Sequence, residues 1–315
     1  MERYVLNHEE MKAYPEPLSA CIGYFDGVHI GHQALVTTAI EAAKQRNIKS
    51  AMITFHPDPW VVLKDMKHVQ HLTTLKDRQD IVEAMGIDVF IVINFTKSLA
   101  AMSKEDFFET ILCQLNLEVL VYGFDFRFGH LGQGDTQYLK DIGSTCFTPI
   151  EVAEVKDDDV KISTTRITHL IQEGKMEEVT RLLKRPYGFG GIVVDGRKKG
   201  REIGFPTANL DILPEYIVPK LGVYIALAIL NQRQFLAMVN IGHNPTFNTR
   251  SDVSVEAYLL DFNEMIYGQR LELKFVHRIR SELKFSSIQE LIEQMNEDYR
   301  YTREYAHEFK LTEQF

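Results

Sequence analysis

The sequence has few of the features that mark secreted, membrane-spanning or zinc-binding proteins. It begins with polar residues and lacks the basic start and apolar core of a signal peptide. No apolar run approaches the roughly 20 residues that a membrane helix needs. There are only three cysteines, scattered and odd in number: Cys21, Cys113 and Cys146. We therefore expect neither a disulfide framework nor a zinc site, and a reducing cytoplasm fits best.

Positive charge is also scarce. The 35 lysines and arginines stand against 44 aspartates and glutamates, and the net charge of −9 argues against a nucleic-acid partner. An anionic substrate such as ATP must then be held by local features, namely helix ends, a few arginines and a magnesium ion. We expect small-molecule partners and no membrane, and the sequence indicates no particular protein partner. A length of 315 residues is enough for two domains.

The most informative stretch is residues 22–32, Ile-Gly-Tyr-Phe-Asp-Gly-Val-His-Ile-Gly-His. It lies between an apolar run and a segment of helical periodicity, where the unpaired N–H groups of a helix start favour phosphate. His29 and His32 add hydrogen-bond donors there, and Gly31 leaves room for a phosphate to approach the backbone. The stretch lacks both the Walker and the dinucleotide pattern. It resembles the nucleotidyltransferase superfamily, although both histidines could be ordinary residues of a first helical turn.

The first half of the chain alternates apolar, strand-like runs with helical patterns near residues 32–46, 76–85 and 104–115. Such alternation predicts a parallel sheet with helices on both faces, and ligands bind such sheets at the carboxyl ends of the strands. The strand-like runs are Leu18–Ile22, Ala51–Phe55, Val89–Ile93 and Val119–Tyr122.

The pattern changes near residue 185, after two helical stretches at 165–173 and 176–184. Short strand-like segments separated by Gly, Pro and Asn then predict an antiparallel barrel or sandwich, followed by a helix from Ile288 to about Glu304. We expect two domains, 1–184 and 185–315. The strand-like segments are Gly191–Val194, Tyr224–Ile229, Phe235–Val239, Val253–Leu260 and Leu271–Phe275.

A second signature occupies residues 191–210. A strand leads into a loop rich in glycine and basic residues, and then into Gly-Phe-Pro-Thr-Ala-Asn at 204–209. The hydroxyl of Thr207 and the amide oxygen of Asn209 are hard ligands that suit magnesium. Backbone N–H groups and cations of the loop suit phosphate, although the stretch Arg197–Arg201 taken alone is more typical of a solvated turn.

Taken together, the two halves resemble one family, the bacterial bifunctional riboflavin kinase/FMN adenylyltransferases, also called prokaryotic FAD synthetases. The resemblance covers almost the whole chain, with the motifs in the family's order. In the first half they are Gly23–His32, Thr54–Pro59, Gly123–Gly129 and Ser163–Arg166. In the second half they are Gly204–Asn209, Val239–Gly242, Pro245–Phe247, Val255–Ala257, Tyr267–Gly268 and Arg280–Glu282 before Phe285.

The resemblance implies an N-terminal Rossmann-like domain with a parallel sheet and a C-terminal antiparallel β-barrel kinase domain that ends in a helix. It also implies two reactions. ATP would phosphorylate riboflavin to FMN, and a second ATP would transfer its adenylyl group to FMN, giving FAD and pyrophosphate.

For adenylyl transfer, the resemblance makes His29 and His32 the groups that hold the ATP phosphates. The nucleophile would be the phosphate of FMN, which is already anionic and needs no protein base. Further ATP contacts would come from Gly23, Phe25, Asp26, Ser163, Thr164 and Arg166. Flavin contacts would come from Phe55, Pro57, Pro59, Asp125 and Arg127 in this half, and from Arg280 in the second half. A core position is as good an interpretation for Phe55, and Arg127 is either a substrate contact or a paired surface cation.

For the kinase, the resemblance makes Glu256 the base that activates the weakly nucleophilic 5′-hydroxyl of riboflavin. The alternative is an exposed strand residue that alternates with Val255 and Ala257. Thr207 and Asn209 would hold magnesium. The ATP contacts would be Gly196, Lys198, Gly200, Gly204, Pro206, Thr207 and Asn209.

The sequence departs from the family's pattern only in the adenylyltransferase half. Tyr24 stands where many members have asparagine, and Thr168 stands where a second arginine is common. His56 and Asp58 vary the polar positions around the prolines. Two alternatives stay open: a riboflavin kinase whose first half is inactive or redirected, and a non-catalytic flavin-binding sensor. The sensor would have no physical reason to keep both a metal ligand and a base.

Overall fold

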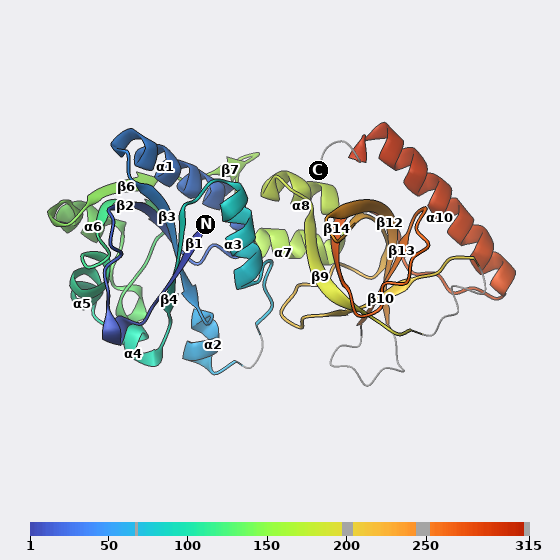
Figure 1. The fold of residues 1–315 in the computed structure, drawn as a ribbon, viewed down its shortest axis with the longest axis horizontal. Helices are drawn as coiled ribbons and strands as arrows, with labels where there is room; N and C mark the ends of the chain where they lie inside the picture. The colour runs from blue at the N-terminus through green and yellow to red at the C-terminus, as the bar shows by residue number, and fades with distance from the viewer. Residues whose placement is uncertain (67–68, 197–203, 244–252, 312–315) are drawn as a thin grey trace. The chain divides into compact units, whose positions relative to one another are not determined.

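The computed structural model describes residues 1–66, 69–196, 204–243 and 253–311. These form two compact units, Met1–Thr164 and Thr165–Phe315, whose elements are labelled in Figure 1. Helices α7 (Thr164–Glu173) and α8 (Met176–Leu183) are thus counted almost wholly with the second unit, whereas the sequence pattern groups them with the first domain.

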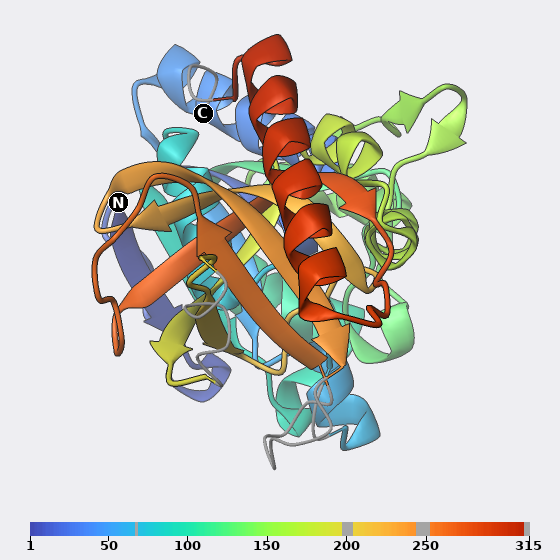
Figure 2. The same ribbon diagram turned by 90° about the vertical axis from the view of Figure 1, so that its right-hand side faces the viewer.

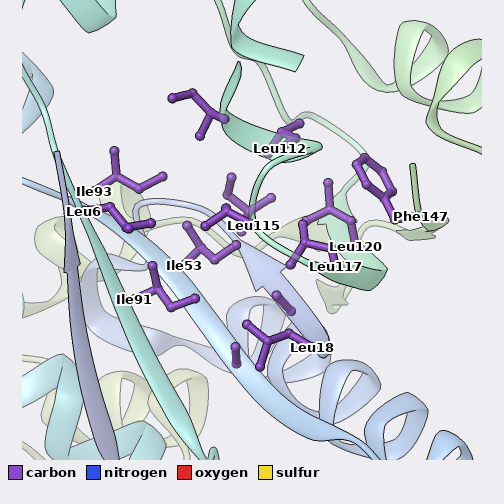
Figure 3. Close-up of a cluster of buried hydrophobic side chains, with 14 of the residues drawn as sticks. Leu6, Leu18, Ile53, Ile91, Ile93, Leu112, Leu115, Leu117, Leu120 and Phe147 are labelled. Atoms are coloured by element: carbon purple, nitrogen blue, oxygen red, sulfur yellow. The ribbon is translucent and has the colours of Figure 1, made fainter. Parts of the chain in front are cut away.

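The first unit is built on a six-stranded, all-parallel sheet in the order β1-β4-β3-β2-β5-β6, which confirms the expected fold class. The central strands bury side chains on both faces, because helices cover both. Ile53 and Ile91 belong to the cluster drawn in Figure 3, and their chain neighbours Met52 and Phe90 belong to a second cluster on the other face. The strands are β1 (Glu2–Leu6), β2 (Leu18–Ile22), β3 (Lys49–His56), β4 (Val89–Asn94), β5 (Leu117–Gly123) and β6 (Thr148–Val152).

Two strands of this sheet escaped the sequence analysis, and both lie at an edge. β1 exposes most of its residues, and β6 is half-exposed and contains Pro149. Edge strands of this kind show little of the continuous apolar run that marks a central parallel strand.

The helices of the first unit connect consecutive strands. They are α1 (Ile30–Arg46), α2 (Pro59–Lys64), α3 (Leu75–Ala84), α4 (Lys97–Ala100), α5 (Lys104–Phe107), which continues as a π-turn η3 (Phe108–Leu112), and α6 (Thr136–Ile142). Short 3₁₀ turns lie at η1 (His8–Glu10), η2 (Asp26–Val28), η4 (His130–Gly132) and η5 (Gly143–Thr145), and a small hairpin is formed by β7 (Lys156–Asp157) and β8 (Val160–Lys161).

The expectation that no disulfide forms was wrong. Cys113, which follows η3, and Cys146, which follows η5, are joined by a disulfide with a Cα–Cα distance of 5.4 Å. The two residues are 33 positions apart, and packing against the same sheet brings their backbones together, which spacing alone did not reveal. Cys21 is a buried free thiol.

The second unit is a closed antiparallel barrel in the order β10-β13-β12-β11-β14-β9, so the barrel and not the sandwich is the correct alternative. Helix α10 (Ile288–Glu308) lies across the outside of the barrel (Figure 2) and packs its Met295 and Tyr299 against the barrel wall. No helix in the described parts of the chain is long and apolar enough to cross a membrane. The strands are β9 (Tyr187–Val194), β10 (Ala208–Ile212), β11 (Gly222–Leu230), β12 (Arg233–His243), β13 (Val253–Leu259) and β14 (Arg270–Arg280).

Candidate active sites

The loop between β2 and α1 is organised by its two histidines. His29 is the N-cap of α1, and its Nδ1 accepts a hydrogen bond of 3.3 Å from the backbone N–H of His32. That bond places the proton of the neutral His29 ring on Nε2. The two imidazoles are stacked with their centroids 3.7 Å apart, and Phe25 meets His32 edge-on at 5.3 Å. The structure therefore brings together three of the residues expected to bind ATP.

His32 is held in its neutral form. Burial, and then the neighbouring His29 and the charge of Arg78, lower the pKa of His32 well below its usual value. Its Nδ1 is buried and has no hydrogen-bond partner among the described residues. The ring can therefore form one more hydrogen bond inside this loop, which a bound phosphate would supply.

Asp26 fastens the loop to the chain before α3. Its carboxylate accepts hydrogen bonds from the backbone N–H of Leu72 and from both the N–H and the hydroxyl of Thr73, all within 3.1 Å. The hydroxyl of Thr164 donates to the backbone oxygen of Asp26 at 3.4 Å. Two candidate ATP residues, Asp26 and Thr164, are thus in contact, and Ser163 directly precedes Thr164. The carboxylate of Asp26 itself holds the loop in shape.

The loop stores backbone strain. Phe25 and the β-branched Val28 both have positive φ, 58° and 40°, a region that side chains rarely adopt. Gly27 also has positive φ, and a Cβ there would lie 2.5 Å from Leu72. Gly31 differs from expectation: a Cβ on it would meet the ring of His29 at 3.1 Å, so this glycine makes room for the imidazole.

The proposed flavin segment spans the end of β3 and the start of α2. Phe55 is half-buried, packs on the central core and meets Phe95 edge-on at 6.0 Å, so its core interpretation is supported. Asp58 caps α2 by accepting a hydrogen bond of 2.5 Å from the N–H of Trp60, while Pro59 occupies the first helical turn after the cis peptide before Pro57. Trp60 is 53% exposed.

Asp125 and Arg127, the other flavin candidates of this unit, follow β5. The carboxylate of Asp125 pairs with Lys161 at 2.7 Å, and Arg127 pairs with Asp135 at 3.4 Å. All four side chains are exposed to a large extent, so Arg127 has the geometry of a paired surface cation.

In the barrel, strand pairing gathers the kinase candidates. Glu256 on β13 is directly opposite Asn209 on β10 and directly opposite Asn240 on β12. Side chains opposite each other on paired strands share a face, so the three lie in a row across the outside of the barrel. The carboxylate of Glu282 lies directly over Gly242 on β12. A Cβ added to Gly242 would be 2.4 Å from a carboxylate oxygen of Glu282 and 3.3 Å from the amide nitrogen of Asn240, so Glu282 extends the row.

A cavity of about 420 Å³ adjoins strands β10 and β13. Pro206 and Thr207 line it, together with Ala257, whose neighbour Glu256 faces the other way in strand alternation. The rest of the lining comes mainly from the segment before β14, with Met265 and Tyr267 among its exposed apolar side chains. Thr207, which lines the cavity, precedes Asn209 by two residues.

The basic loop between β9 and β10 is only partly described. Lys198 and Gly200 lie outside the described residues. At its edges, a Cβ on Gly196 would collide with the side-chain amide of Asn209, and Gly204 has a φ of 86°. Gly196 therefore lies directly against a candidate magnesium ligand.

Comparisons with known proteins identify the family. Residues 11–166 match the family model described as FAD synthetase, and residues 183–306 match the one described as riboflavin kinase. A Listeria monocytogenes protein named bifunctional riboflavin kinase/FMN adenylyltransferase is 39% identical over 90% of each chain. The chain belongs to this bifunctional family.

Further relatives of the same name support this membership. The Bacillus subtilis protein is 39% identical over 88% of this chain and 89% of its own, and the Escherichia coli protein is 31% identical over 95% and 96%. A solved structure from Streptococcus pneumoniae, described as a macrolide-efflux protein, has a TM-score of 0.87 and 31% identity, covering 96% of this chain and 99% of that one. It has the same two-unit fold.

Among the residues assigned by likeness to the family, Arg166 and Thr168 belong to α7 in the second unit and stay predictions. Arg280 is committed to another partner: its guanidinium forms hydrogen bonds of 2.7–3.0 Å with both oxygens of Asp298 on α10. Asp298 is 3% exposed, and Gln294 also donates to it. Arg280, the last residue of β14 and the first of the Arg280–Glu282 motif, thus holds α10 against the barrel.

We expect Arg280→Ala to lower the free energy of unfolding of the second unit by about 3–5 kcal/mol, because it leaves the buried Asp298 charge without a partner. Urea unfolding followed by far-UV circular dichroism measures this, while Trp60 fluorescence follows the first unit separately. Arg300→Ala on the exposed side of α10 is the matched control and should change stability by less than about 0.5 kcal/mol. Equal stability of the two variants would contradict the importance of the ion pair.

Two candidates were missed by the sequence analysis. Asn240 was seen as part of a motif without a role, and only strand register places it beside Glu256. Arg78 was not singled out, because an arginine at a helical position is normally solvated. In the structure it is only 2% exposed and lies against the loop between β2 and α1.

Proposed function

We propose that the chain makes FMN and FAD, with riboflavin phosphorylated in the barrel and FMN adenylylated in the N-terminal unit. Both family models match in the order that this division requires. The observation that supports the kinase assignment best is the register that sets Glu256 beside Asn209, next to a cavity lined by Thr207. The functional boundary near residue 184 is part of this proposal.

In the kinase half, Glu256 acts as the general base. Its carboxylate takes the proton of the ribityl 5′-hydroxyl as that oxygen attacks the γ-phosphate of ATP, and ADP leaves. The adenine of ATP would lie in the apolar part of the cavity, where Met265 and Tyr267 offer flat or flexible surfaces. Thr207, which also lines the cavity, would then be near the phosphates.

The donor set fits magnesium. Thr207 offers a hydroxyl and Asn209 an amide oxygen, which are ligands of the hard type that this ion prefers. When bound, magnesium neutralises negative charge on the transferred phosphoryl group. Asn240 is placed to orient Glu256 from the opposite strand.

In the adenylyltransferase half, the phosphate of FMN attacks the α-phosphate of ATP and pyrophosphate leaves. The nucleophile is already anionic, so the protein contributes positioning and charge neutralisation. His29 and His32 would donate hydrogen bonds to the triphosphate, supported by Ser163, Thr164 and Arg166. The shape of the loop is maintained by Asp26 and its bonds to Leu72 and Thr73.

We place the protein in the cytoplasm, because both reactions consume ATP, and we propose that it acts on small molecules without nucleic acid or membrane. The Cys113–Cys146 disulfide favours an oxidising compartment instead. We give more weight to the need for ATP in both reactions than to this disulfide.

The test is a chromatographic time course with riboflavin, ATP and magnesium, repeated from FMN. The proposal expects FMN first and FAD second, with pyrophosphate released only in the second step. If riboflavin gives FMN and neither experiment gives FAD, the kinase assignment is supported and the adenylyltransferase assignment is rejected. If no ATP is consumed, both enzymatic assignments are rejected and the alternative of a non-catalytic flavin-binding sensor is supported.

We expect FMN to quench the fluorescence of Trp60, the only tryptophan, because α2 would adjoin the isoalloxazine ring. The measurement is a fluorescence titration without ATP, with free N-acetyltryptophanamide as the control for light absorbed by FMN. Quenching no greater than that of the free compound, in a protein that still makes FAD, would remove α2 from the flavin site.

A further inference from the structure

Arg78 occupies an unusual position for an arginine. It belongs to α3, it is 2% exposed, and its Nη1 donates a 2.7 Å hydrogen bond to the backbone oxygen of Tyr24. The same nitrogen lies 3.4 Å from the hydroxyl of Thr54 on β3. The guanidinium thus joins the loop after β2 to the end of the adjacent strand.

The guanidinium of Arg78 forms no ion pair in the described part of the chain. No carboxylate lies within 4.0 Å of the guanidinium there, and its Nε is buried without any hydrogen-bond acceptor. The ring of Tyr24 covers the cation, with 4.6 Å between Cζ and the ring centroid. Buried arginines are normally paired with a carboxylate, because desolvating the charge is costly.

The guanidinium of Arg78 lies against the Gly23–His32 loop, through its hydrogen bond to the Tyr24 carbonyl. After burial and the neighbouring His29, the charge of Arg78 is one of the influences that lower the pKa of His32. Tyr24, which stands where many family members have asparagine, is the residue whose ring and carbonyl enclose this cation. An anion that entered the loop would relieve the uncompensated charge.

We propose that Arg78 is a positioning residue for adenylyl transfer, and that its buried charge is balanced only when a polyphosphate occupies the Gly23–His32 loop. The inference rests on the proposed function for the identity of the substrate, ATP. The ligand class follows from the charge itself: triphosphate or pyrophosphate. Arg78 acts through the Tyr24 carbonyl and through its field, and it does not contact the reacting atoms.

The decisive comparison is Arg78→Met against the wild type in the full-length protein. Thermal unfolding is followed by Trp60 fluorescence, because the only tryptophan belongs to the first unit. Without ligand, Arg78→Met should unfold at the same temperature as the wild type or higher, because an uncompensated buried charge is replaced by an apolar chain of similar length. Magnesium pyrophosphate should raise the unfolding temperature of the wild type and not that of the variant.

Activity provides the second readout. FAD formation from FMN and ATP should fall about 100-fold in Arg78→Met, mainly in kcat, while phosphorylation of riboflavin by the barrel is unchanged. Arg78→Lys keeps the charge and should retain most of the pyrophosphate-induced shift. Lys76→Met, which removes an exposed cation from the same helix, is the matched control and should alter neither quantity.

Three outcomes would overturn the inference. One is a lowered unfolding temperature of Arg78→Met with an undiminished pyrophosphate shift, which would make Arg78 merely structural. Another is wild-type FAD formation in that variant. If Arg78→Met does not fold, loss of the shift in a folded Arg78→Lys would equally reject a role for the charge. A wild type that binds pyrophosphate and makes no FAD would instead reject the proposed function.

Discussion

Replacing Glu256 by glutamine should slow phosphorylation of riboflavin by about 10²–10⁴-fold, the range typical for loss of a general base. Glutamine preserves the size of the side chain and its place in the row between Asn209 and Asn240, but it cannot accept the hydroxyl proton at neutral pH. Stability should therefore stay near that of the wild type. The measurement is the initial rate of FMN formation at saturating ATP.

Two comparisons make this result specific. FAD formation from added FMN should keep its wild-type rate in the Glu256→Gln protein, because that reaction is assigned to the other unit. Asp211→Asn neutralises an exposed carboxylate two residues after Asn209 on the same strand and should leave both rates unchanged. Phosphorylation at more than a tenth of the wild-type rate in Glu256→Gln would exclude the base role.

Replacing His29 by asparagine should lower FAD formation by about 10²–10³-fold, as expected when one donor to a charged transition state is lost. Asparagine is a good N-cap, so its side chain can still accept the hydrogen bond from the backbone of His32 and keep the start of α1. The loss would then report on the imidazole rather than on helix stability. The measurement is kcat and KM for ATP and FMN, starting from FMN.

The control for this variant is His8→Asn, which changes a histidine of the same unit outside the loop. It should retain FAD formation, and both variants should phosphorylate riboflavin normally. If His29→Asn formed FAD within tenfold of the wild-type rate, the histidine pair would not be the phosphate-binding element.

The central strands of both units were predictable from sequence because local pattern reports burial. Leu18–Ile22 was placed with its correct ends, since a parallel strand buried on both faces is a continuous apolar run. The edge strands β1 and β6 gave no such signal and were missed. β10 is paired on both sides in the closed barrel, but it is short and not continuously apolar, and it was missed as well. The disulfide was missed for a related reason, because pairing depends on how distant segments pack.

The candidate sites divide in the same way. Residue type and spacing were enough to point to His29, His32 and Thr207, because a helix start after a strand and a rigid proline before hard ligands suggest phosphate and metal by themselves. Glu256 was expected only from the resemblance to the family. Spacing could not tell that Asp26 is consumed by bonds to Leu72 and Thr73, that Arg280 holds a buried aspartate, or that Arg127 has a surface partner.

The sequence by itself indicated two domains, their fold classes and the central strands of the parallel sheet, since these depend on short-range pattern, and it predicted the chemical type of both sites. Only the tertiary structure decided which side chains face one another. Register between β10, β13 and β12 assembled Asn209, Glu256 and Asn240, and the packing of α3 under the β2 loop buried Arg78 without a carboxylate. Such contacts join residues far apart in the chain, and their energies depend on burial that no local pattern records.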